Sequence, residues 1–213
     1  MIIELTHKAI IVILASGILT VLLPSVPPVA TSVAMPAVQL PDAELLDQHG
    51  TSVRLARDVV GDRIIALSFI YTDCHTACPV SLAMFSELQS RLGEKQARDV
   101  RIVSLSINPA VDSPARLKAY AEHFHAKPGW IWLTGKKAQI DALLKELGIY
   151  TNDHASHASV ILVGDPIFGE WRRFNNFSNP EAIAAKIDEL LDARDELLVA
   201  RDASPRERIS ASH

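Results

Sequence analysis

Cysteine is nearly absent from this chain, since its 213 residues contain only two. Both lie in one stretch, at Cys74 and Cys78, so the N-terminal segment has no cysteine that could carry a lipid anchor. The chain also lacks a basic cluster and has a formal net charge of −4, which argues against nucleic acid as a partner. No internal repeat is found, which favours a single domain.

Charge is missing from one N-terminal segment, Ala9 to Leu23. Its length suits the apolar region of a signal peptide and is short of the roughly 20 residues that a spanning helix needs. Small residues at positions 32–34 predict cleavage after Ala34, although Ile2, Ile3 and Leu5 could lengthen the segment into an uncleaved anchor. We therefore predict that residues 1–34 are a signal peptide or an N-terminal membrane anchor. The remainder is expected in the periplasm, free or anchored to the membrane and facing that space.

The rest of the chain divides by composition into three parts. Residues 35–40 end a proline-containing stretch and are predicted to be a tether. Residues 41–194 hold the alternating apolar patterns of a folded domain and are long enough for a sizeable core. Residues 195–213 are rich in charge and poor in large apolar side chains, so we predict a disordered tail.

The two cysteines lie between a predicted strand and a predicted helix. Ile64 to Tyr71 is a near-continuous apolar run, typical of a strand that is buried on both faces. Pro79 to Leu92 carries apolar residues at helical spacing and begins with a proline, which suits the first turn of a helix. Cys78 is then at a helix N-terminus, where the dipole favours a thiolate.

Further strands and helices alternate along the domain. This order predicts an α/β fold with a thioredoxin-like mixed sheet flanked by helices. The other predicted strands are Ser52–Leu55, Val100–Ile107, Ser159–Val163 and Glu170–Phe174; the other predicted helices follow Ser113, span Gln139–Leu147 and begin at Pro180.

The cysteine pair alone leaves the chemistry open. Two thiols separated by three residues can close a disulfide or bind one metal ion. A purely structural disulfide is disfavoured, because so short a loop gains the least from a cross-link. A metal-independent thiol-disulfide oxidoreductase is the main alternative to a metal site, whereas no separate motif supports a peroxide-reducing enzyme.

A histidine could complete a metal site. His154 and His157 precede the predicted strand at Ser159, in a loop that faces the cysteine helix in a thioredoxin-like layout. Thioredoxins have a cis-proline at that position, whereas this chain has Ala158 and Ser159, which favours a metal. His75 lies between the cysteines and could join them; surface positions are expected for His7, His49, His123, His125 and His213.

Several motifs resemble those of the Sco/SenC copper proteins, which help assemble the dinuclear copper site of cytochrome c oxidase. Thr72-x-Cys74-x-x-x-Cys78-Pro79 is similar to the cysteine motif of that family, and the segments Leu105–Pro114 and Leu133–Gly135 match its later motifs. The family's metal histidine stands nine residues before a proline in a hairpin turn, as His157 does before Pro166. His154 follows an acidic residue, Asp153, which is also common in the family, and is the alternative ligand.

The resemblance implies a copper-binding metallochaperone with thiol-disulfide reductase activity as a further expectation. Cys74 and Cys78 would be a redox-active pair and, with His157 or His154, the ligands of Cu(I), Cu(II) or both. Thiolates and imidazole suit copper but also Zn²⁺, so ligand type alone does not decide the metal. The implied partners are a membrane-bound cytochrome oxidase subunit or another copper chaperone, and a protein that reduces thiols.

Overall fold

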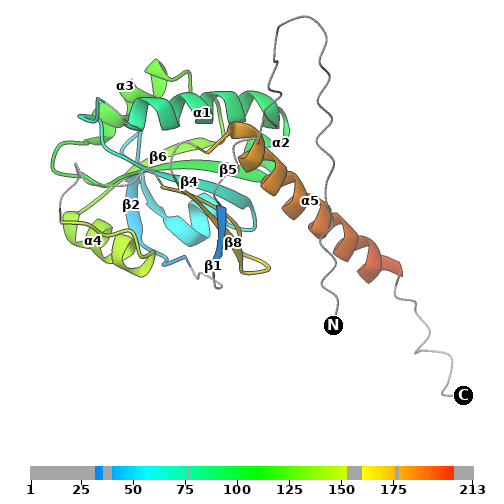
Figure 1. The fold of residues 1–213 in the computed structure, drawn as a ribbon. Coiled ribbons are helices and arrows are strands. Elements are labelled where there is room, and N and C mark those ends of the chain that lie inside the picture. Colours follow the sequence, from blue (N-terminus) through cyan, green and yellow to red (C-terminus); the bar gives the residue numbers. More distant parts are fainter. Residues whose placement is uncertain (1–31, 36–39, 76, 153–159, 176–177, 204–213) are drawn as a thin grey trace, which may run out of the picture.

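The computed structural model describes residues 32–35, 40–75, 77–152, 160–175 and 178–203. These residues form strands, α-helices and one π-helical turn (Figure 1). The strands are β1 (Ser32–Met35), β2 (Glu44–Asp47), β3 (Ser52–Arg54), β4 (Ile64–Ile70), β5 (Val100–Ser106), β6 (Trp130–Thr134), β7 (Val160–Asp165) and β8 (Glu170–Asn175). The helices are α1 (Ala77–Leu92), α2 (Lys95–Arg98), α3 (Pro114–His123), α4 (Lys137–Glu146) and α5 (Pro180–Ala203), and the π-helical turn is η1 (Leu55–Val60).

The strands of the described residues form one mixed sheet in the order β1-β8-β7-β4-β5-β6-β2-β3. The central strands β4, β5 and β6 are parallel, while β7 pairs antiparallel with β4 and β8 pairs antiparallel with β7. β4 lies between β5 and β7 and is buried along its whole length, as its apolar run predicts. The predicted mixed α/β sheet is confirmed.

Helices cover both faces of this sheet (Figure 1). Successive side chains of a strand point to opposite faces, so β4 supplies two cores. Ile64, Ala66 and Ile70 join the core beneath α1, α3 and α5, and the intervening apolar residues of β4 join the core beneath α4 and η1. Cys74 and Cys78 belong to the first of these cores.

Three strands were not predicted, and two predicted boundaries differ from the structure. The unpredicted strands are β1, β2 and β6. β1 pairs antiparallel with β8 and includes residues assigned from the sequence to the signal segment and the tether. Helix α5 continues to Ala203, so the prediction of a disordered tail from residue 195 is wrong for residues 195–203. The remainder of that tail lies outside the described residues.

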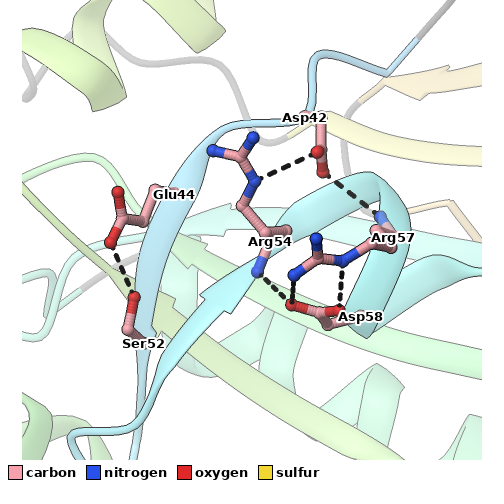
Figure 2. Close-up of polar contacts among 6 residues, drawn as sticks. All are labelled: Asp42, Glu44, Ser52, Arg54, Arg57 and Asp58. Carbon is pink, nitrogen blue, oxygen red and sulfur yellow. Dashed lines mark hydrogen bonds and ion pairs between the residues drawn. The ribbon is translucent and has the colours of Figure 1, made fainter.

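Polar contacts hold η1 against the short hairpin formed by β2 and β3 (Figure 2). Asp42 accepts from Arg54 Nε at 3.1 Å, and Asp58 accepts from the backbone N–H of Arg54 at 2.8 Å. The Arg57 guanidinium donates to both oxygens of Asp58. This donor, followed by the backbone N–H of Arg54, lowers the pKa of Asp58 to about 2. The hairpin and the π-helical turn are therefore fixed together at the surface.

Candidate metal centre

The two cysteines lie where β4 leaves the sheet and α1 begins. β4 ends at Ile70, and the backbone N–H of Cys74 donates to the Tyr71 carbonyl at 3.1 Å, which turns the chain toward the helix. Cys78 is the second residue of α1. The predicted placement, after a central strand and at a helix N-terminus, is confirmed.

Both cysteines are buried and are not joined by a disulfide, and a hydrogen bond links one to the other. Cys74 is 4 % exposed and Cys78 is 7 % exposed. The backbone N–H of Cys78 donates to Cys74 Sγ at 3.2 Å. Two soft sulfur donors, one of which accepts from the backbone of the other cysteine, suit a single thiophilic metal ion and also suit the formation of a disulfide.

Burial raises the pKa of the Cys78 thiol to about 12, and the hydrogen bond with Cys74 and the charge of Asp112 act in the same direction. The helix N-terminus, which we expected to favour a thiolate, therefore does not offset this rise. The low-dielectric surroundings and a neighbouring carboxylate penalise a further negative charge more than the helix terminus favours it. A bound cation would supply the missing positive charge, and its binding would release protons.

A buried carboxylate, Asp112, lies behind the cysteine loop. It follows β5 and precedes α3, and it accepts from Thr72 Oγ1 at 2.5 Å and from Ser106 Oγ at 2.6 Å. Asp112 does not cap α3, because the side chain of Ser113 is that cap and accepts from the Arg116 N–H. The sequence signal for another role of Asp112 was that it stands next to Ser113 and is also a residue type that caps helices, although one helix needs only one such cap.

The histidines are placed unevenly relative to this site. His154 and His157 lie in residues 153–159, outside the described residues. β7 begins at Val160 and runs antiparallel to β4, so Val160 lies at the same edge of the sheet as Ile70. His75 is exposed between the cysteines, and the surface positions predicted for His49, His123 and His125 are confirmed.

Two further observations concern the described ranges only. No group of three His, Cys, Asp or Glu side chains in them is arranged to hold one metal ion. None of their helices has both the length and the apolar composition needed to cross a bilayer. In the described part, the candidate centre therefore consists of two sulfur donors and the polar groups that support their loop.

Comparisons with known proteins identify similar sequences and folds. A family model described as SCO1/SenC matches residues 37–192. The SCO1 protein homolog of Bacillus subtilis is 37% identical over 90 residues, which cover 42% of this chain and 45% of that protein. The SCO2-like protein of Rickettsia felis is 33% identical over 109 residues, 51% of either chain. The chain thus spans about half the length of the curated relatives it matches.

Solved structures agree with the fold. Bradyrhizobium japonicum ScoI, solved with copper bound, is 28% identical with a TM-score of 0.58, and the match covers 72% of this chain and 99% of that chain. BsSco, described as a member of the Sco family of cytochrome c oxidase assembly proteins with a disulfide switch, is 25% identical with a TM-score of 0.61. That match covers 74% of this chain and 96% of the other.

Proposed function

The chain belongs to the SCO1/SenC family, and we propose that it is an exported copper chaperone for the copper site of a membrane-bound cytochrome oxidase. The observation that carries this proposal is the pair of buried cysteines between β4 and the start of α1, which are not joined by a disulfide and in which the Cys78 N–H donates to Cys74 Sγ. A copper-bound relative of the same fold supports it.

The proposed ligands are Cys74, Cys78 and His157, with His154 as the alternative imidazole. Two thiolates and one imidazole form a soft set of three donors that suits Cu(I) and can also hold Cu(II). His157 is preferred because only Ala158 and Ser159 separate it from β7, which begins at Val160. A short link to a sheet strand limits the movement of a ligand, and a defined metal geometry needs such support.

Copper delivery and thiol reduction would use the same pair of cysteines. The cysteines offer thiolates to copper only when they are reduced, and the same reduced pair could pass electrons to a disulfide on the target protein. We propose delivery of copper to the oxidase as the main activity. Since an exported protein works in an oxidising compartment, a partner that reduces thiols would restore the pair. The N-terminal apolar segment supports export, either as a signal peptide or as a membrane anchor.

Metal analysis of the reduced protein after loading with copper tests this proposal. Wild type should retain one copper per chain, and Cys74→Ser and Cys78→Ser should retain little. In competition with a Cu(I) chelator, His157→Ala should bind at least about tenfold more weakly, since even loss of a residue that only supports a ligand typically costs that much. His154→Ala is the matched control and should change affinity only slightly. The reverse order would assign the ligand to His154.

A second candidate function is a metal-independent thiol-disulfide oxidoreductase. The adjacent thiols favour it, because they are placed to exchange between a dithiol and a disulfide without metal. Such an enzyme would require both cysteines but neither loop histidine. Reduction of a disulfide-bonded substrate peptide, followed for wild type and for His157→Ala without copper, separates the two functions. Equal turnover combined with no copper retention would favour the oxidoreductase.

A further inference from the structure

We propose that Asp112 is a positioning residue for the cysteine loop: its buried carboxylate, acting through Thr72, holds Cys74 within reach of Cys78. This role deepens the proposed function. Only the copper measurement described below depends on that function, whereas the disulfide measurement does not. The placement of one sulfur beside the other matters equally for a metal ion and for a disulfide.

Asp112 has the burial and the contacts of a residue that organises its surroundings. It is 1 % exposed, and its carboxylate accepts from the Thr72 backbone N–H at 3.2 Å, from Thr72 Oγ1 and from Ser106 Oγ. These three donors are uncharged. A buried charge is costly unless hydrogen bonds compensate it, so the loop and the carboxylate stabilise each other.

Thr72 transmits this contact to a second group. Its hydroxyl donates to Asp112 and accepts from Arg116 Nε at 2.5 Å. The Arg116 guanidinium also pairs with Asp73. The two residues that directly precede Cys74 are therefore both held from the α3 side. Thr72 is held through its backbone and side chain, and Asp73 is held through an ion pair with Arg116.

The two sulfurs differ in how they are fixed. Cys78 belongs to α1, whose backbone is held by the helix and by packing on the sheet. Cys74 precedes the helix, and its sulfur accepts the Cys78 N–H only while the loop keeps its present course. Freeing the backbone of one loop residue corresponds to about a tenfold change in an equilibrium constant. Losing the Asp112 contact should therefore weaken every reaction that needs both sulfurs together.

Asp112→Asn and Thr72→Val test this role, with two matched controls. Asp165→Asn alters a carboxylate that is 0 % exposed and lies at the end of β7, away from the cysteines. Ser104→Ala removes a buried hydroxyl that bonds Ser68 and Trp130 in the sheet. Thr72→Ser retains the hydroxyl that Thr72→Val removes, and it should behave like wild type.

The first measurement is metal-free: the equilibrium of the cysteine pair with reduced and oxidised glutathione. Asp112→Asn and Thr72→Val should each lower the equilibrium constant for disulfide formation by about tenfold. Thr72→Ser and both controls should stay within about twofold of wild type, even where a control lowers the melting temperature as much. If Asp112→Asn does not fold, Thr72→Val and its rescue by Thr72→Ser still decide.

The second measurement is Cu(I) affinity in competition with a chelator, which should fall in parallel with the disulfide equilibrium. A glutathione equilibrium that is unchanged in Asp112→Asn and Thr72→Val would overturn the positioning role, as would an equal shift in the controls. A wild-type protein that binds no copper, yet whose disulfide equilibrium responds as expected, would overturn the proposed function and leave Asp112 in its role.

Discussion

Replacing Cys78 by serine should remove a pH dependence of stability that the buried thiol creates. The pKa of Cys78 is raised from an ordinary value of 9.0 to about 12, mainly by burial. Between these values the unfolded chain loses the proton while the folded protein keeps it. The free energy of unfolding therefore falls as pH rises, and the stabilisation present below pH 9 is lost on approach to pH 12.

The size of this loss follows from the shift. One pH unit corresponds to about 1.4 kcal/mol, so the full interval amounts to roughly 4 kcal/mol. Of the two pH units between pH 8 and pH 10, only about one lies above the ordinary thiol pKa of 9.0. Wild type should therefore lose about 1.4 kcal/mol more than Cys78→Ser over that range. Lysine and tyrosine side chains also titrate there, but they are common to both proteins and cancel in the comparison.

Urea denaturation of reduced, metal-free protein at pH 8 and pH 10 measures this difference. A chelator and a phosphine reductant keep the thiols free of metal and of disulfide. Equal losses in wild type and in Cys78→Ser would refute the reasoning, because they would mean that the folded protein releases the Cys78 proton as easily as the unfolded chain does.

Three other outcomes are expected. Mild oxidation to the disulfide should abolish copper retention, measured by atomic absorption, because a disulfide offers no thiolates; equal retention before and after oxidation would remove the cysteines from the ligand set. Gly164→Ala should cost about 1–3 kcal/mol in urea, because a Cβ there would lie 2.3 Å from the Trp171 ring, and an unchanged midpoint would show that the ring can shift. Arg194→Met should cost about 3 kcal/mol in thermal denaturation, because the buried Asp165 carboxylate would lose its cationic partner; a loss below about 1 kcal/mol would mean that this ion pair contributes little.

The parts of the fold that were predicted correctly are those where burial leaves a pattern in the sequence. β4 is buried on both faces and reads as an apolar run, and α1 shows apolar residues at helical spacing. β2 is a four-residue strand in which only Leu45 is fully buried, so it carries almost no pattern. β6 is different: Trp130 to Leu133 is an apolar run after Pro128 and Gly129, and its signal was present in the sequence.

The environment of the candidate site could not be predicted from the sequence. The motif identified the cysteines, but their environment depends on residues about 40 positions away, such as Asp112. Sequence spacing says nothing about such pairings. The raised pKa of Cys78 likewise depends first on burial and then on the neighbouring Cys74 and Asp112, which the motif does not reveal.

The short strand β3 has a consequence for how the protein meets other molecules. It is an edge strand of the described sheet and has three residues, of which Ser52 and Arg54 are polar. The Arg54 guanidinium is tied to Asp42 beside that border. Short, charged border strands resist pairing with a strand of another chain, and so protect against aggregation. Association through strand addition is thus discouraged on this side.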